Sequence, residues 1–185
     1  MWEGNTIKNS YNGALNGAEL DSSKKILATN YQWVGGVAGQ NQGDVFNCYS
    51  SDEVIGSTYV GGIAGQNAGG KISNAVAYGK IIGASTYVGG VVGKVDNNLT
   101  ITTVTNASNI TSSGDYVSGL FGYVGNNITL DTVENNGNIL STGAIGYVSG
   151  VIGYAGKVVT ITTSVINNGT VTSSGKDGYV SGIVS

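Results

Sequence analysis

The sequence predicts an all-β protein that folds as a single parallel β-solenoid, or β-helix, with three short strands in each coil. Three observations support this prediction. Similar segments recur every 26–32 residues, they are rich in Val, Ile and Thr, and each ends at Gly, Asn or Ser. One such coil cannot bury its apolar side alone, but stacked coils can. We expect one domain over residues 1–185, with six to seven coils.

The first strand of each coil is predicted by an aromatic residue, Val, a small residue and Gly, as in "YVSGLFGY" (Tyr116–Tyr123). Stacking would place the valines above one another in the core. These valines are Val34, Val60, Val88, Val117, Val148 and Val180. The aromatic residues before them should form a parallel row: Trp33, Tyr59, Tyr87, Tyr116, Tyr147 and Tyr179.

The second strand is predicted by an Asn that follows an aliphatic residue by two positions. Stacked Asn side chains can bond to one another in a ladder, and Asn tolerates the left-handed backbone of a tight corner. We expect one column: Asn9, Asn47, Asn74, Asn106, Asn135 and Asn167.

The third strand is predicted by an aliphatic residue soon followed by Gly. Its column is Leu15, Val54, Ile81, Ile110, Ile139 and Val171. Residues 18–32 fit none of the columns and are expected to be an insertion between coils.

Composition excludes several classes of function. The net charge is −3 without a basic cluster, which argues against a nucleic-acid partner. The sequence contains no run of 18 consecutive apolar residues, so we expect no membrane insertion. Neither end carries a recognisable signal or cap, so we expect a segment of a longer protein, or a subunit that associates end to end through open coils.

We expect no catalytic, cofactor-binding or metal-binding residue, and therefore no enzyme activity. The single cysteine, Cys48, has no His to activate it as a nucleophile. The acidic residues occupy different positions of the repeat. The best local pair, Asp131 and Glu134, is interpreted as solvated turn charges.

The aromatic row is the one candidate ligand-contact stripe. Because side chains alternate along a strand, the rings should lie opposite the buried valines, at the surface. An exposed aromatic stripe can bind sugar rings or a partner protein, whereas rings that stack on one another can simply stabilise the rod. A regular array of threonines leaves ice binding as a more remote alternative: Thr100/Thr102, Thr129/Asp131 and Thr160/Thr162.

The segments "WVGGVAGQNQGDVFNCYSSDEVIG" (Trp33–Gly56) and "YVGGIAGQNAGGKISNAVAYGKIIG" (Tyr59–Gly83) resemble the GLUG repeat. The resemblance extends over about residues 33–93, and only Gly119–Gly122 keeps the Leu of the motif. It implies a β-solenoid in secreted or surface-attached proteins, including adhesins and non-catalytic regions of immunoglobulin A1-type metallopeptidases. It implies no catalytic residues.

Together these observations predict a non-enzymatic structural or adhesive repeat module of a secreted or cell-surface protein. Its expected location is extracellular, and its expected partner is a host protein, a cell-surface protein or a glycan. A carbohydrate-binding or carbohydrate-processing β-helix is the main alternative.

Overall fold

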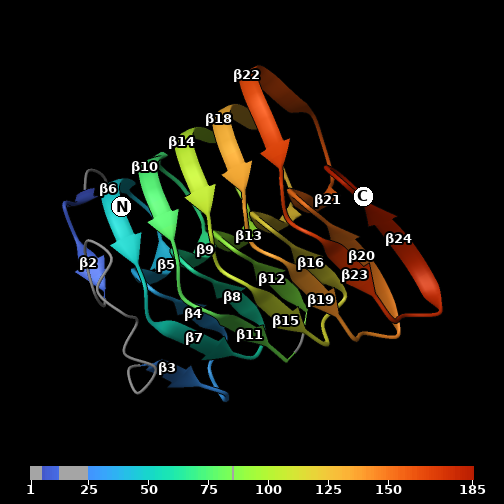
Figure 1. Ribbon diagram of the computed structural model, residues 1–185. Coiled ribbons are helices and arrows are strands. Elements are labelled where there is room, and N and C mark those ends of the chain that lie inside the picture. Colours follow the sequence, from blue (N-terminus) through green and yellow to red (C-terminus); the bar gives the residue numbers. More distant parts are fainter. Residues whose placement is uncertain (1–5, 13–24, 85) are drawn as a thin grey trace.

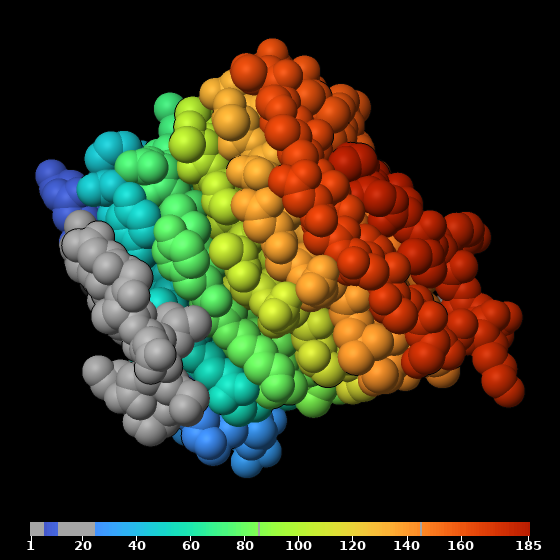
Figure 2. Space-filling view, in the orientation of Figure 1, coloured from blue at the N-terminus to red at the C-terminus, as the bar shows by residue number. Residues whose placement is uncertain are grey.

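The computed structural model describes residues 6–12, 25–84 and 86–185. All the regular secondary structure in these ranges is β-strand. The chain winds into a parallel β-solenoid with four sheets. Figure 1 shows equivalent strands of successive coils side by side, and in Figure 2 the coils form adjacent bands from the N-terminal to the C-terminal end. The predicted β-solenoid is therefore confirmed.

We name the sheets A to D. Sheet A contains β1 (Thr6–Lys8), β2 (Tyr11–Asn12), β6 (Asp44–Ser50), β10 (Ile72–Ala77), β14 (Leu99–Asn106), β18 (Ile128–Asn135) and β22 (Val159–Asn167). Sheet B contains β3 (Lys25–Ala28), β7 (Glu53–Gly56), β11 (Ile81–Gly83), β15 (Ile110–Ser112), β19 (Ile139–Ser141) and β23 (Val171–Ser173).

The other two sheets carry the aromatic residues. Sheet C contains β4 (Trp33–Gly35), β8 (Tyr59–Gly61), β12 (Tyr87–Gly89), β16 (Tyr116–Ser118), β20 (Ile145–Ser149) and β24 (Asp177–Ser181). Sheet D contains β5 (Ala38–Asn41), β9 (Ala64–Asn67), β13 (Val92–Val95), β17 (Phe121–Val124) and β21 (Ile152–Ala155).

Each coil has four strands, one from each sheet, so the prediction of three strands per coil is wrong. There are five complete coils, from β4–β7 to β20–β23, rather than six to seven. The first predicted strand is in fact two, such as β8 and β9, which are separated by Gly62 and Ile63. Consecutive glycines suggest a bend within one strand, whereas here they form a corner between two sheets.

The predicted valine column is confirmed. Val88 pairs in parallel register with Val60 on one side and Val117 on the other, and the same register continues to both ends of the row. Five members of this row are buried, and only Val180, on the last strand, is exposed. Burying a valine contributes about 1.5–3 kcal/mol, so this row is a substantial part of the core.

The third column is confirmed from Val54 to Val171, all in register on sheet B. Its first predicted member, Leu15, lies outside the described residues. Ile26 of β3 pairs with Val54 instead. Lys25–Ala28 therefore belong to a coil, although they fall within the segment 18–32 that was expected to be an insertion.

The predicted asparagine column is wrong as a single row. Asn9, Asn47 and Asn74 form one ladder, in which each of the later two donates a hydrogen bond to the Oδ1 of the previous one over 2.7 Å. All three have left-handed backbone, with φ near 50°. The position that follows Asn74 in this row is Thr103, because β14 pairs Ser73 with Thr102 and Ala75 with Val104.

The later asparagines form a second ladder at the C-terminal ends of β14, β18 and β22, whereas Asn47 and Asn74 lie within their strands. We call the ladder of Asn9, Asn47 and Asn74 the outer ladder and this second one the inner ladder. Asn106 pairs with Ala77 in the coil before and with Asn135 in the coil after, and Asn135 pairs with Asn167. Both Asn-to-Asn hydrogen bonds are 2.7 Å long. The later coils have longer sheet A strands, so an Asn two residues after an aliphatic side chain falls at a different structural position.

The interior consists of two apolar clusters that meet at a narrow waist. One cluster lies between sheets A and D and includes Ile72, Ile101 and Phe121, while the other lies between sheets B and C. At the waist, the first Gly of each Gly-x-x-Gly segment faces the end of a sheet A strand. A Cβ on Gly119 would lie 2.3 Å from Cγ of Asn135 and 2.1 Å from the Gly150 carbonyl oxygen. The motif therefore needs glycine here because of close packing.

Candidate functional site: two files of tyrosine rings

The predicted aromatic stripe forms a stacked file along sheet C. Its members occupy equivalent strand positions from β4 to β24. Neighbouring ring centroids are 5.3, 5.0, 5.2 and 4.9 Å apart from Tyr59 to Tyr179. The rings of Tyr116 and Tyr147 are nearly parallel, at 5°. We call these five tyrosines the first file. Trp33 precedes them in register on β4 and is 42 % exposed.

A second file lies on sheet D, which the sequence did not predict. Tyr123 and Tyr154 stack at 5.2 Å with 13° between their planes. They also meet the first file edge to face, with Tyr116 5.5 Å from Tyr123 and Tyr147 5.3 Å from Tyr154. The two files together form the tyrosine face. A signal for it was present, because both "YVSGLFGY" and "YVSGVIGY" end in Tyr, but the fourth strand that carries this Tyr was not recognised.

The glycines of the motif allow the two files to meet. The last Gly of Gly-x-x-Gly packs against the sheet C backbone: a Cβ on Gly122 would lie 2.8 Å from the Val88 nitrogen. With no side chain between them, sheets C and D approach closely, and residues such as Tyr116 and Tyr123 reach each other across the corner. The sequence motif thus builds the tyrosine face directly.

In the centre of the first file the ring faces are occupied by other rings. Tyr116 has Tyr87 on one side and Tyr147 on the other, at 5.0 and 5.2 Å. Both neighbours, like Tyr116, are partly exposed. What reaches solvent is therefore largely the ring edge, and a sugar ring that stacks on an aromatic face would find a free face mainly at the ends of the file.

In the first three complete coils polar side chains occupy the positions of the second file. Lys94 occupies the sheet D position equivalent to Gln66 and Tyr123. Its ammonium group lies 5.3 Å from the centroid of Tyr59 and 6.0 Å from that of Tyr87, within cation–π range. It also forms a 2.7 Å ion pair with Asp96, which accepts a hydrogen bond from Gln66.

The surroundings of the tyrosine face shift the pKa values of two of its tyrosines and of the neighbouring lysine. Partial burial raises the pKa of Tyr87 and of Tyr116, since it disfavours the phenolate. Partial burial also lowers the pKa of Lys94, but the hydrogen bond from Lys94 to Asp96 and the charge of Asp96 outweigh this effect, so its pKa is raised. Tyr87, Tyr116 and Lys94 therefore keep their protons to higher pH than the same groups free in water.

The threonine array lies on the outer side of sheet A. Thr100, Thr129 and Thr160 are in register across β14, β18 and β22. Asp131 interrupts the neighbouring row and accepts hydrogen bonds from Thr162 and Thr163. Within the residues described, no group of three or more His, Cys, Asp or Glu side chains could hold a metal ion.

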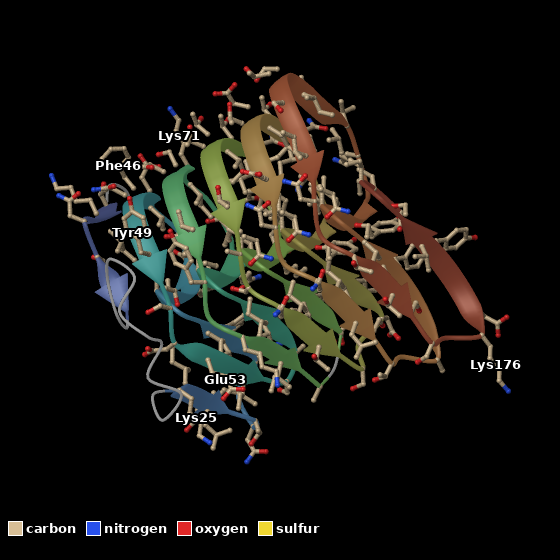
Figure 3. The ribbon with its side chains drawn as sticks, viewed as in Figure 1. Lys25, Phe46, Tyr49, Glu53, Lys71 and Lys176 are labelled. Atoms are coloured by element: carbon tan, nitrogen blue, oxygen red, sulfur yellow. The ribbon has the colours of Figure 1, made fainter. Side chains whose placement is uncertain are left out.

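Two further aromatic residues lie away from the tyrosine face, Phe46, which is exposed, and Tyr49, which is partly buried. Phe46 and Tyr49 lie on β6 of sheet A, where Figure 3 shows both side chains together with Lys71 at the edge of the molecule. The Tyr49 hydroxyl donates to Oδ1 of Asn47, on the outer asparagine ladder. Cys48, between them in sequence, is buried. No described helix is long and apolar enough to cross a membrane.

Residues 56–82 match the family model of the GLUG motif. The GLUG motif thus covers β8 to β10 and part of β11, that is, most of one coil. Its recurrent glycines are the ones that form the corner between sheets C and D. Neither the curated proteins nor the solved structures compared with this chain gave a significant match.

Proposed function

We propose that this GLUG-containing β-solenoid is a non-enzymatic structural and adhesive module of a secreted or cell-surface protein. The GLUG motif and the solenoid fold fit a structural repeat module. The observation that carries the proposal is the in-register stacking of equivalent residues through all five coils. Such a rod holds a fixed length and presents one surface repeatedly.

The adhesive part of the proposal rests on the tyrosine face. Each of its rings packs against neighbouring rings, and the central tyrosines are partly exposed. Tyrosine supplies a large contact area with a polar end at low cost in conformational entropy, which suits a protein-binding surface. The partner is then a host or cell-surface protein. Glycan binding by face stacking receives less support, because the central ring faces are covered.

A direct test measures binding of the intact chain to immobilised extracellular-matrix proteins and to a glycan array. We expect protein binding that is lost when Tyr123 and Tyr154 are both changed to Ser. The control variant is Tyr78→Ser, since Tyr78 is exposed but lies outside the face. Binding that survives the double change, or binding of glycans alone, would contradict the adhesive proposal.

Localisation needs a separate experiment. A reagent that modifies lysine and does not cross membranes should label the protein on intact cells of its source, or in their medium. Lys25, Lys71 and Lys176 lie at the periphery of the solenoid and should react (Figure 3). Labelling only after lysis would contradict a surface or secreted location.

A further inference from the structure

The tyrosine face joins seven phenols in one continuous network. Each ring of the two files lies within 5.7 Å, centroid to centroid, of at least one other. Tyr116 alone contacts four rings, those of Tyr87, Tyr123, Tyr147 and Tyr154. Phenols are among the most easily oxidised side chains, so such a network has a chemistry that isolated tyrosines lack.

We propose that the tyrosine face is a site of oxidative cross-linking, at which a one-electron oxidant joins two copies of the chain through dityrosine. This chemistry does not depend on the adhesive role. The reactant that must be supplied is a diffusible outer-sphere one-electron oxidant, two equivalents for each bond formed.

The reaction balances as follows in atoms and electrons. Each of two tyrosines gives one electron to an oxidant molecule and its phenolic proton to water, which leaves two phenoxyl radicals. The radicals join through the ring carbons next to the hydroxyls. The two hydrogens on those carbons then move to the oxygens, so both hydroxyls are restored. In total, two electrons and two protons leave, and one carbon–carbon bond forms.

The stacked arrangement favours bonds between copies over bonds within a file. Neighbouring coils are about 4.8 Å apart. This spacing is shorter than the separation of the two Cβ atoms in a dityrosine, so adjacent rings such as Tyr116 and Tyr147 cannot join while they remain stacked. Their edges, which carry the reactive carbons, face outward, where a ring of another molecule can reach them.

The network also lets a radical move before it reacts. Transfer of an electron and a proton between two tyrosines changes little in energy, because donor and acceptor are the same chemical group. Rings in contact, such as Tyr123 and Tyr154, allow the electron to pass, and water at the exposed edges accepts and returns the proton. A radical formed at any ring of the face can therefore reach its most exposed member, Tyr179, which is 63 % exposed.

Two isolated tyrosines provide an internal comparison. Tyr31 is 70 % exposed and Tyr78 is 47 % exposed, and neither has a ring partner among the described residues. If exposure alone controlled the reaction, most of the dityrosine would form at Tyr31, Tyr179 and Tyr78, in that order. The proposal predicts instead that Tyr31 and Tyr78 contribute little and that the bonds map to the tyrosine face.

The test uses the intact chain and a ruthenium(III) tris-bipyridine oxidant, generated by brief illumination of the ruthenium(II) complex with persulfate as the electron acceptor. Covalent dimers are measured by denaturing electrophoresis, dityrosine by its fluorescence, and the joined positions by peptide mapping. A triple variant, Tyr116→Phe, Tyr147→Phe and Tyr154→Phe, keeps the stacked rings but removes three oxidisable phenols. The matched control is Tyr31→Phe with Tyr78→Phe.

We expect wild-type cross-links to map to the tyrosine face, the triple variant to lose most dimer and dityrosine, and the control to keep most of both. The double change Tyr116→Phe with Tyr123→Phe should lower the yield by more than the share of bonds that map to these two residues, because it removes both phenols that link Tyr87 to the rest of the network. Bonds that map mainly to Tyr31 and Tyr78 would overturn the proposal. Dityrosine confined to monomers would overturn the step between copies.

Discussion

The first two complete coils and the last three use one backbone path with different side chains at the waist. At the ends of β6 and β10 the waist residues are Ser50 and Ala77, while β14 and β18 end in Asn106 and Asn135. All four are buried. The glycine that faces them is retained in every coil, so the backbone approach is the constant feature and the side chain opposite it is variable.

Buried asparagine is not absent from the early coils but lies at another corner. Asn41 and Asn67 stack at the end of sheet D, and Asn41 bonds to both the N–H and the C=O of Gly43. Asn135 does the same with Gly137 at the end of sheet A. The local arrangement is therefore the same at both corners. The Asn side chain bonds to the backbone of the residue two positions later, and its amide also bonds to the Asn of the next coil.

The ladder on sheet D and the inner ladder on sheet A end differently, and the difference shows what the last asparagine of a ladder requires. Asn67 is followed in register by Val95, and its Nδ2 has no hydrogen-bond partner. Asn167, at the last coil, donates to the Gly169 carbonyl. A ladder that stops inside the rod thus leaves a buried polar atom unsatisfied, which costs free energy.

The largest effect is expected from breaking the feature shared by all coils. In Gly119→Ala the new Cβ would meet the Gly150 carbonyl and Asn135, so we expect a loss of about 3 kcal/mol or more in unfolding free energy. Denaturant titration measures this. Gly182→Ala is the control, because a Cβ there would meet nothing within 4 Å. Equal stability of the two variants would show that the waist is not closely packed.

The next largest effect should come from the asparagine ladders. Asn135→Ala removes hydrogen bonds to Asn106, Asn167 and Gly137 and leaves buried backbone groups unpaired, at an expected cost of about 2 kcal/mol. Asn67→Ala should cost less, because one side of that amide already lacks a partner. If both changes cost the same in thermal and denaturant unfolding, the ladder in the later coils has no special role.

A smaller effect, a gain in unfolding free energy, is expected when the asparagine of the outer ladder is introduced at the equivalent position of a later coil. Thr103 has φ 54°, where a β-branched residue is strained, and it follows Asn74 in the outer row. Thr103→Asn should relieve this strain and extend the outer ladder, with a gain of about 1 kcal/mol. Thr132→Asn, whose backbone is not left-handed, should give no gain and serves as the control. A destabilised Thr103→Asn would contradict this reading of the row.

The smallest effect on stability should come from the raised pKa values of two tyrosines, and it should appear only at alkaline pH. The pKa values of Tyr87 and Tyr116 are raised from 10.0, so the unfolded chain releases these protons first. The stability they contribute is fully present below pH 10 and is lost as pH rises through the folded pKa. Phenolate absorbance during alkaline titration should show late-titrating tyrosines, and Tyr87→Phe should remove its own contribution while that of Tyr116 remains. Titration of all tyrosines together would contradict the effect of burial.

The sequence was sufficient for the parts of the fold whose local pattern is the same in every coil. Val60 and Val88 occupy the same place in every coil because the aromatic–Val–small–Gly pattern never changes. It was not sufficient for sheet D, because β9 begins just after a Gly pair and contains Gly65, so it resembles a loop. The shift from the outer to the inner asparagine ladder was also missed, since both ladders show the same local pattern and only the register separates them.

The candidate site was predicted in part for the same reason. The first file follows the regular pattern, and Tyr116 lies where strand alternation placed it. That it would face a second aromatic file depended on the corner between sheets C and D. Contacts such as Tyr116 with Tyr154 join different coils and different sheets, so no spacing in the sequence reveals them.

The four parallel sheets also determine how the molecule would respond to tension. Each coil is bonded only to its two neighbours, so a force that separates the two ends detaches coils one after another. Each detached coil would release roughly 100 Å of extended chain. A tether built from such coils would lengthen in steps of similar size while the coils that remain keep their shape.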